Sequence, residues 1–397
     1  MTHIFINALS ASAGGGLTYV RNVIPCLASR EDARATILVP ENLRAEIDPS
    51  DRVKILAEEY PQSLARRFFY EQRVLPAIIR ASGADVLLCT GNFALFRSPV
   101  RQILLSRNAL YLSKDFLRDL RRRRDYRLWA DTKIKGAFAR WSVRAADCTV
   151  APSEAFARDL QQWVGKPVTC IYHGFNPQAF FRRNQALPNH AEKHFNATAG
   201  AFRILFVSHY NYYRNFETLL RAIAIIKKEL YPRPIRLILT CKLAFAENPG
   251  SYRADRAASL VAELGVRDEV IELGVVPYTA LHNLYRDCDV YATPAYAETF
   301  AHPLVEAMAS GLPVIASDLA VHREICGDAA LYFPCFSPED LAHRIMQVSS
   351  SDGRRQEMRE MGLRRSEDFS WDKHVDQLLQ LARHLSENPR LFSEDPT

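Results

Sequence analysis

The sequence has no run of about 18 consecutive apolar residues, the length that a membrane-spanning helix requires. Met1–Asn7 has no basic region followed by an apolar stretch and a small-residue cleavage site, so we expect a first β-strand there and not a signal peptide. The eight cysteines form no CxxC pair and no metal-ligand spacing, and most lie in apolar runs, as buried thiols do. These absences favour a soluble cytoplasmic protein.

Several catalytic motifs are also absent. The sequence contains no phosphate-binding P-loop, no catalytic serine elbow and no zinc-ligand spacing. What is present is the composition of a globular protein, with 48% hydrophobic and 24% charged residues. A chain of 397 residues is too long for one ordinary core and fits two domains.

The positive charge is concentrated in one part of the chain. Residues 101–150 contain ten Arg and three Lys against five Asp, a local charge of +8 that exceeds the +6 of the whole chain. Within it, the basic segment 118–144 includes Arg118, Arg121–Arg124 and Arg127, interleaved with aromatic and aliphatic residues. One hypothesis is a solvated helix face whose arginine stems cover apolar surface; the other is attraction to an anionic membrane surface. Nucleic acid is disfavoured because no recognition motif accompanies the segment.

Short apolar strands alternate with amphipathic helical patterns in both halves, which predicts parallel sheets buried on both faces. In the first half we expect strands at Ile4–Leu9, Thr36–Val39, Asp85–Cys89, Gln102–Leu105, Cys148–Ala151 and Val168–Tyr172, and helices at Leu17–Ala28, Leu64–Ala81 and Glu154–Trp163. In the second half we expect strands at Ile204–Ser208, Ile235–Thr240, Val270–Leu273, Val290–Thr293 and Pro313–Ala316. The helices expected between and after them are Phe216–Leu230, Arg253–Leu264, Leu281–Arg286, Pro303–Ser310, Pro338–Val348, Arg354–Ser366 and Trp371–Ser386.

These patterns predict an α/β protein with two doubly wound, Rossmann-like domains that face a central cleft. We expect an N-terminal domain at 1–175, a linker at 176–200, where periodicity lapses, and a C-terminal domain at 201–370. A C-terminal helix at 371–386 and a flexible tail at 387–397 complete the chain. Ligands of such sheets bind outside the carboxyl ends of the strands.

The most informative segment runs from Tyr296 to Asp318. A strand ends near Pro294, a loop carries Glu298, and a helix follows with Pro303 at its first position and Glu306 at the end of its first turn. Helical side chains lean toward the N-terminus, so the Glu306 carboxylate is expected to point back to the loop. Two carboxylates beside the free N–H groups of a helix start offer acceptors for vicinal hydroxyls and donors for phosphate. Either glutamate alone would be explained by the helix dipole.

Glu298, seven residues, Glu306 and then AMASGLPVIASD resemble the E-x7-E signature of retaining glycosyltransferases of family 4, which have the GT-B fold. The resemblance covers nearly the whole chain. It extends to ADCTVAPSEAFARDL (Ala146–Leu160), HGFNPQAF (His173–Phe180), LGVVPYTALHNLYRDCDVYATP (Leu273–Pro294) and FSWDKHVDQLL (Phe369–Leu379). The last of these matches the C-terminal helix that crosses back to the N-terminal domain in that family.

The resemblance implies roles for residues of the C-terminal half. Glu306 matches the residue that binds the donor ribose hydroxyls, and Glu298 the residue that holds hydroxyls of the transferred sugar. The backbone N–H groups of Phe300 and Ala301 would face the sugar and diphosphate. Arg214 matches the cation that neutralises the departing diphosphate, a contribution of about 10²–10³ in rate for one such donor.

Further donor contacts are implied by two short segments. Gly14–Gly16 follows the first strand and permits close approach of the backbone to a ligand, and in the family this loop lies beneath the donor phosphates and the acceptor. Gly15 and Gly16 are therefore candidate donor-binding residues. Val275 and Val276 match positions whose main chain meets the nucleobase, although core packing explains them about equally well.

The chain departs from the family pattern at two places. The family often has a Gly–Arg pair where this chain has Ser208–His209, and an N-terminal-domain histidine where this chain has Arg107 and Asn108. Asn108 is a candidate for orienting sugar or acceptor, and Arg107 for supplying charge. His302 lies beside the glutamates but is interpreted as structural.

Asp287–Cys288–Asp289 matches the DxD metal motif of other sugar transferases. Because it lies where a helix ends and a buried strand begins, we interpret it as a turn and expect neither a metal nor another cofactor.

The resulting hypothesis is a retaining hexosyltransferase that uses a GDP- or UDP-linked sugar and a glycan or lipid-linked glycan acceptor, as in bacterial surface polysaccharide or lipopolysaccharide assembly. The enzyme is expected to be cytoplasmic, with a possible peripheral position at the inner face of the membrane through the basic segment. Two alternatives stay open: a GT-B-fold sugar-nucleotide epimerase, and a non-catalytic nucleotide-sugar-binding protein.

Overall fold

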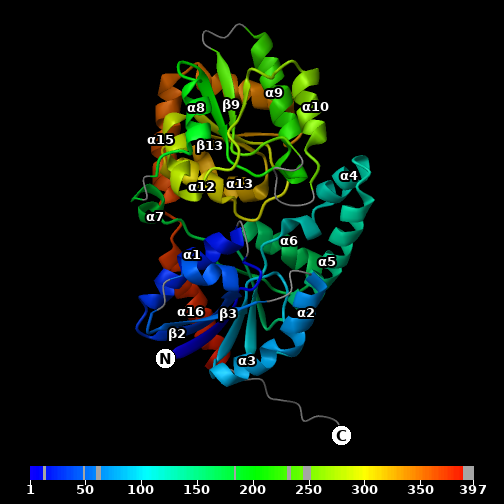
Figure 1. The fold of residues 1–397 in the computed structure, drawn as a ribbon, viewed down its shortest axis with the longest axis vertical. Coiled ribbons are helices and arrows are strands. Elements are labelled where there is room, and N and C mark those ends of the chain that lie inside the picture. The colour runs from blue at the N-terminus through cyan, green and yellow to red at the C-terminus, as the bar shows by residue number, and fades with distance from the viewer. Residues whose placement is uncertain are drawn as a thin grey trace. The chain divides into compact units, whose positions relative to one another are not determined.

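The computed structural model describes residues 1–11, 15–47, 50–59, 64–182, 185–229, 234–244 and 252–387. The chain divides into two compact units. The N-terminal unit comprises Met1–Leu112, Asp131–Gly174 and Ser370–Thr397, and the C-terminal unit comprises Ser113–Ala130 and Phe175–Phe369. Each is an α/β unit built on one sheet (Figure 1).

The sheet of the N-terminal unit is parallel and has the strand order β3-β2-β1-β4-β5-β6-β7. Its strands are β1 (Thr2–Asn7), β2 (Ala33–Pro40), β3 (Val53–Glu58), β4 (Val86–Cys89), β5 (Arg101–Leu105), β6 (Cys148–Ala151) and β7 (Thr169–Cys170). Central β1 is buried along its whole length, because helices cover both faces. The strand order reverses between β1 and β4, which is the switch point where such sheets bind ligands.

The helices of this unit are α1 (Gly15–Ala28), α2 (Leu64–Arg73), α3 (Leu75–Ser82), the second part of α5 (Tyr126–Ala145), α6 (Glu154–Val164) and α16 (Trp371–Glu387). Helix α16 packs on α1 and on β1, β4 and β5 (Figure 1). Its apolar side chains Val375, Leu378 and Leu379 belong to the same core as Ile4 and Ile6 of β1. The last segment of the described chain is therefore an integral part of the N-terminal unit.

The sheet of the C-terminal unit is also parallel, with the order β10-β9-β8-β11-β12-β13. Its strands are β8 (Phe202–Phe206), β9 (Ile235–Leu239), β10 (Val270–Glu272), β11 (Val290–Thr293), β12 (Val314–Ser317) and β13 (Ala330–Phe333). Here the switch point lies between β8 and β11.

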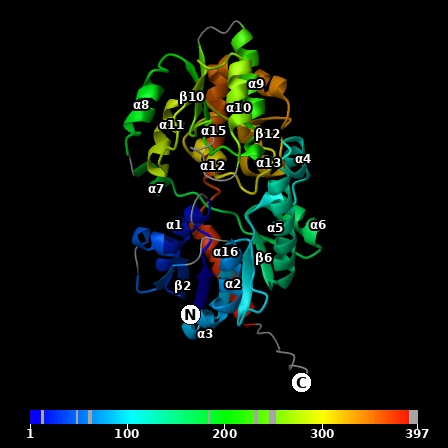
Figure 2. The ribbon, with the colours of Figure 1, turned by 45° about the vertical axis from the view of Figure 1, so that its right-hand side comes forward.

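The helices of the C-terminal unit are α4 (Lys114–Arg122), the start of α5, α7 (Pro177–Arg182), α8 (Asn189–Asn196), α9 (Phe216–Lys228), α10 (Asp255–Glu263), α11 (Leu281–Asp287), α12 (His302–Ala309), α13 (Ala320–Cys326), α14 (Pro338–Ser349) and α15 (Asp352–Ser366). Helix α9 packs against α10 and α14, and the turned view shows α9 and α10 side by side (Figure 2). Helix α12 packs against α13 and α15. Serine caps start several helices; Ser113 and Ser337, for example, accept the N–H of the third residue on.

The predicted fold class, two doubly wound parallel sheets, is confirmed. Some elements differ from the sequence analysis. The single helix predicted at 64–81 is broken at Val74, where Pro76 near the start of α3 has no N–H to donate to the preceding turn. Strands β3 and β13 and helix α13 were not predicted.

The domain boundaries also differ in part. Residues 113–130, placed in the first domain by the sequence analysis, belong to the C-terminal unit, because Asp119 and Arg123 pair with residues of that unit. The predicted linker 176–200 contains α7 and α8, whose Phe180 and Phe195 are buried in the same unit. Of the predicted tail, residues 388–397 lie outside the described part of the chain.

Candidate functional site

The switch point of the C-terminal sheet brings together two loops that the sequence analysis selected. The loop after β8 leads through a 3₁₀ turn, Tyr212–Arg214, into α9, and the loop after β11 carries Glu298 before α12. Because β8 and β11 are neighbours, Arg214 and Glu298 meet although 84 residues separate them.

Arg214 and Glu298 form a close ion pair. Arg214 Nη1 lies 2.5 Å from Glu298 Oε2, and the Thr299 N–H donates to Glu298 Oε1 over 3.0 Å. Their side chains are only 20% and 11% exposed. Burial alone would raise the pKa of Glu298, but the Arg214 charge outweighs it, so the pKa lies below its usual value. The glutamate is therefore held ionised next to a fixed cation.

Two residues that the sequence analysis did not select surround this pair. His322 on α13 is fully buried, its Nδ1 lies 2.9 Å from the Ser317 carbonyl oxygen, and its proximity further lowers the pKa of Glu298. Tyr291 on β11 is buried within electrostatic reach of Arg214, Glu306 and Glu298. No spacing in the sequence indicates His322, because α13 itself was not predicted.

Glu306 is held in a different way from Glu298. It lies on α12 with 5% exposure, and Tyr285 Oη donates to its Oε2 over 2.8 Å. Tyr278 also hydrogen-bonds to this carboxylate. Burial raises the pKa of Glu306 to about 7, while the two tyrosine hydrogen bonds oppose that shift. Tyr278 lies in the 3₁₀ turn Tyr278–Ala280 and Tyr285 on α11, which follows directly.

The start of α12 has an unusual backbone conformation. Ala301, the N-cap, is left-handed at φ 65° and ψ 62°, a region that favours glycine. The helix begins at His302, one residue before the predicted start, and Pro303 takes its second position. Phe300 is buried, with its ring edge-on to Phe369 at 5.4 Å between centroids, so its contribution to a ligand is limited to the main chain.

The two valines expected to meet a nucleobase lie in the loop after β10 and differ in exposure. Val275 is 57% exposed, whereas the Val276 side chain is buried. Gly274 before them has φ +78°, which lets the chain turn there. Val275 is therefore the more accessible of the two to a ligand, and Val276 anchors the loop in the core.

The N-terminal unit places Arg107 and Gly15 together at its own switch point. Arg107 Nη1 donates to the Gly15 carbonyl oxygen over 2.9 Å, and Nη2 donates to that of Thr90 over 2.7 Å. The guanidinium also lies 5.1 Å from the centroid of the Tyr19 ring. Burial lowers the pKa of Arg107 to about 10. No carboxylate in the described part of the chain forms an ion pair with it.

The other candidates of this unit are placed as follows. A Cβ on Gly16 would lie 3.1 Å from Ala11 Cα, so a larger residue would have to push the Ala11 backbone away by a few tenths of an ångström, and glycine allows the close approach. Gly14 lies outside the described residues. Asn108 Oδ1 accepts the Leu110 N–H and caps a 3₁₀ turn; its role toward a sugar stays a prediction.

The Asp287–Asp289 pair is engaged with arginines and backbone. Asp287 pairs with Arg286, and Asp289 Oδ2 accepts the Arg203 N–H over 2.7 Å. Among the residues that the structure describes, no cluster of three or more His, Cys, Asp or Glu side chains has an arrangement suited to a metal ion.

Comparison with protein families gives two matches, one for each half. Residues 13–179 match the family described as Glycosyltransferase Family 4, and residues 190–365 match Glycosyl transferases group 1. The chain belongs to the family 4 glycosyltransferases.

Curated relatives of this chain align with it mainly over parts of their length. A D-inositol 3-phosphate glycosyltransferase of Rhodococcus erythropolis is 29% identical over 43% of the chain and 39% of its own length. O-antigen chain mannosyltransferase B of Escherichia coli is 31% identical over 32% of the chain and 33% of its own length. The chain thus spans about two fifths or less of these two relatives.

Solved structures show the same fold over almost the whole chain. Sucrose-phosphate synthase of Thermosynechococcus elongatus has a TM-score of 0.75 at 18% identity, covering 98% of this chain and 100% of that one. HepE of Anabaena, in complex with UDP-glucose, has a TM-score of 0.70 at 18% identity, covering 97% and 100%. WaaG, a glycosyltransferase of lipopolysaccharide biosynthesis, has a TM-score of 0.67 at 14% identity, covering 96% and 99%. The GT-B fold predicted from the sequence is confirmed.

Proposed function

We propose that this protein transfers a hexose from a GDP- or UDP-linked donor to an acceptor hydroxyl with retention of anomeric configuration. The observation that carries the proposal is the Arg214–Glu298 pair at the switch point of the C-terminal sheet. A buried, fixed cation stabilises charge that develops on a departing diphosphate, and it costs no reorganisation during the reaction.

In this mechanism Glu298 accepts hydrogen bonds from hydroxyls of the transferred sugar, because its lowered pKa keeps it ionised. Glu306 receives the ribose hydroxyls, and the main chain at Phe300 and Ala301 faces the sugar and diphosphate. The bond between the anomeric carbon and the phosphate oxygen breaks as the acceptor oxygen attacks from the same side. The acceptor proton passes to the leaving phosphate, so no protein nucleophile and no metal ion are required.

The relatives support the choice of donor and pathway. HepE of Anabaena has been solved with UDP and with UDP-glucose, which supports a nucleotide-linked sugar for a chain of the same fold. The relative O-antigen chain mannosyltransferase B and the structural neighbour WaaG support an acceptor in surface polysaccharide or lipopolysaccharide assembly.

Donor binding tests the proposal without knowledge of the acceptor. UDP, GDP, UDP-glucose and GDP-mannose are titrated against the parent and Glu306→Gln, with Asp328→Asn on the 3₁₀ turn Gly327–Ala329 as the control. Loss of a hydrogen bond to a carboxylate should weaken the affinity for the preferred donor by about tenfold to a hundredfold, while the affinity of the control stays within about twofold of the parent. Equal donor affinity in parent and Glu306→Gln would remove Glu306 from the site.

Product analysis separates the three functions that the sequence left open. A transferase releases nucleoside diphosphate only with acceptor, and NMR of the product shows the donor's anomeric configuration. An epimerase converts the donor sugar without acceptor, and a binding protein releases nothing. Inversion at the anomeric carbon would contradict the retaining mechanism.

We further propose that the protein works at an anionic membrane surface through the basic segment. No helix within the described residues is long and apolar enough to cross a membrane. On α5, however, Ile134, Phe138 and Trp141 recur on one side of the helix and are 58%, 40% and 53% exposed. Exposed Lys133 and Arg140 lie on the same helix. Exposed aromatic groups beside cations are typical of an interfacial helix.

Vesicle co-sedimentation tests this surface. Lys133→Gln/Arg140→Gln should weaken binding to phosphatidylserine-containing vesicles by more than tenfold, at about 1 kcal/mol per charge. Leu363→Ala, which removes an exposed apolar side chain of the C-terminal unit, is the control and should bind like the parent. Equal binding of parent and double variant, or equal binding to neutral vesicles, contradicts the proposal.

A further inference from the structure

The C-terminal unit contains a cavity of about 570 Å³ in which none of the proposed donor-binding residues takes part. Its walls come from α4 and the residue pair after it, from the first turns of α9 and α10, and from the loops after β11 and β13. Six arginines line it: Arg122, Arg123, Arg124, Arg221, Arg253 and Arg256. We call it the arginine cavity.

Only one of these arginines is neutralised by carboxylates of the wall. Arg123 Nε lies 2.9 Å from Asp119 Oδ2, and its Nη2 lies 2.7 Å from Glu217 Oε1. Tyr296 Oη donates to the same Asp119 oxygen over 2.8 Å, which fixes the carboxylate. Arg123 is thus a structural cation, only 15% exposed, and it does not face outward as the basic segment suggested.

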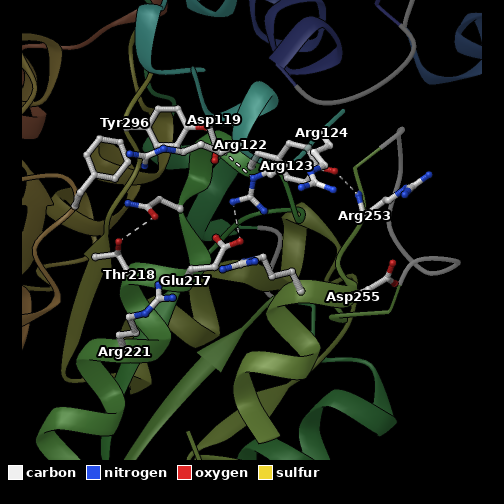
Figure 3. Close-up of a pocket in the computed structure, with 14 residues that line it drawn as sticks. Asp119, Arg122, Arg123, Arg124, Glu217, Thr218, Arg221, Arg253, Asp255 and Tyr296 are labelled. Carbon is white, nitrogen blue, oxygen red and sulfur yellow. Dashed lines mark hydrogen bonds and ion pairs between the residues drawn. The ribbon is translucent and has the colours of Figure 1, made fainter. Parts of the chain in front are cut away.

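The other five arginines form no ion pair with a carboxylate in the part of the chain that the structure describes. The only remaining acid in the wall is Asp255. Figure 3 shows Arg122 and Arg124, at and just after the end of α4, on one side and Arg221 of α9 on the other, with Arg253 and Asp255 both at the end away from Arg221. Like charges brought together from sequence-distant segments repel one another, and a bound anion relieves that repulsion.

Arg124 adds a second observation. It follows α4 at φ +55°, where its N–H donates to the Arg121 carbonyl oxygen and the Asp125 N–H donates to that of Leu120. This Schellman arrangement normally places glycine at the left-handed position. An arginine there is strained, and the strain is offset if the guanidinium has a ligand.

We propose that the arginine cavity binds a phosphate-bearing ligand, a phosphate monoester or diphosphate, at a site separate from that of the sugar donor. The planar guanidinium matches phosphate oxygens through paired hydrogen bonds, which favours phosphate over smaller anions. The amino ends of α9 and α10 lie in the wall and favour negative charge at the same place. This proposal goes beyond the sugar transfer and does not rest on it.

Calorimetric titration with inorganic diphosphate at low salt tests the site. Arg221→Gln/Arg253→Gln should weaken the affinity by at least about tenfold, and Arg127→Gln, an exposed arginine outside the cavity, should stay within about twofold. Because diphosphate can also bind near Arg214, Arg214→Gln is titrated in parallel. A diphosphate affinity that falls in Arg214→Gln but not in Arg221→Gln/Arg253→Gln overturns the proposal.

Arg124→Gly separates binding from folding because its two effects have opposite signs. Glycine relieves the left-handed strain, so the melting temperature should rise by about 1–3 °C, while diphosphate affinity should fall about threefold or more. If Arg221→Gln/Arg253→Gln proves unstable, this variant decides alone. A stabilised Arg124→Gly with unchanged affinity overturns the proposal.

Vesicles identify the source of the phosphate. If it is a lipid headgroup, phosphatidic acid vesicles retain the parent, free diphosphate releases it, and Arg124→Gly is retained less. If it is a soluble phosphate, diphosphate binds in the calorimeter but leaves vesicle retention unchanged. Retention that neither diphosphate nor Arg124→Gly alters, together with no calorimetric binding, overturns the proposal.

Discussion

The two sheets each place an arginine at the switch point, but the two arginines are held by different partners. In the C-terminal unit Arg214 faces the carboxylate of Glu298 at 2.5 Å, and its pKa is raised because this pairing outweighs burial. In the N-terminal unit Arg107 donates to two backbone carbonyls and has no carboxylate partner in the described residues, and its pKa falls to about 10. The Arg214–Glu298 pair is neutral, whereas Arg107 carries an uncompensated charge.

The difference indicates how each edge meets a ligand. At the C-terminal edge the charges are arranged in advance, so a ligand finds an oriented cation and an oriented acceptor together. At the N-terminal edge two carbonyls accept hydrogen bonds from the terminal nitrogens of the Arg107 guanidinium, but its Nε is buried without a partner among the described residues. The charge also remains, and an anionic group can neutralise it. Removing each arginine should therefore have unequal consequences.

The largest effect is expected from Arg214→Ala. The substitution leaves Glu298 buried without its cation, which should lower the free energy of unfolding by about 3–5 kcal/mol at pH 7, and turnover should fall by about 10²–10³. Because the pKa of Glu298 is depressed in the parent, its stabilising contribution is present above the unfolded pKa and is lost as pH falls through the folded pKa. Urea unfolding at pH 7 and pH 4 should show the deficit shrinking with acid.

Arg118→Ala is the matched control, because Arg118 forms an exposed ion pair with Asp115 in the same unit. It should change the unfolding free energy by less than about 1 kcal/mol. A deficit in Arg214→Ala no larger than this, or one that does not vary with pH, would contradict the preorganised pair.

Glu306 sharpens the comparison within the C-terminal unit, because it is buried with tyrosines and no cation. Its pKa of about 7 lies above the unfolded value, so its ionisation destabilises the fold progressively as pH rises from about 4.5 to about 7. The whole effect is about 3 kcal/mol. The free energy of unfolding of Glu306→Gln, measured in urea relative to the parent, should therefore rise by about that amount between pH 4.5 and pH 8. A difference that is constant with pH would place the Glu306 carboxyl in a more polar environment than the structure shows.

Arg107→Gln should cost the least of the charged substitutions. The substitution leaves no buried carboxylate of the described residues without a cation. The free energy lost with the hydrogen bonds to Gly15 and Thr90 is offset because a desolvated charge is removed. We expect a change of about 1 kcal/mol or less in the free energy of unfolding. A loss as large as that of Arg214→Ala would mean that Arg107 is paired with a carboxylate after all.

The sequence predicted the fold well where strands are continuously apolar, as in β6 and β11, whose predicted limits match the structure. It failed at β3, an edge strand whose residues after Lys54 are all half-buried, and at the broken helix 64–81. For the site, the family resemblance selected Arg214, Glu298 and Glu306, because these residues can be recognised by their position relative to sequence motifs. It could not select His322 or reveal the arginine cavity, whose residues converge only through tertiary packing.

The smallest effect concerns the backbone at the start of α12 and tests whether the C-terminal edge is strained as well as charged. Ala301 has φ 65°, a conformation in which alanine is disfavoured by about 1–2 kcal/mol and glycine is not. Glycine also increases the conformational entropy of the unfolded chain, which lowers the stability of the fold by about 0.4–1 kcal/mol and partly cancels this gain. Ala301→Gly should therefore stabilise the fold by about 0.5–1 kcal/mol in urea unfolding.

Ala309→Gly, in the last position of the same helix, is the control and should lower stability by up to about 1 kcal/mol. If both substitutions destabilise alike, Ala301 is not in the left-handed region in solution. If Ala301→Gly stabilises the fold and weakens donor binding, the strained alanine holds the α12 start in the conformation that the donor requires.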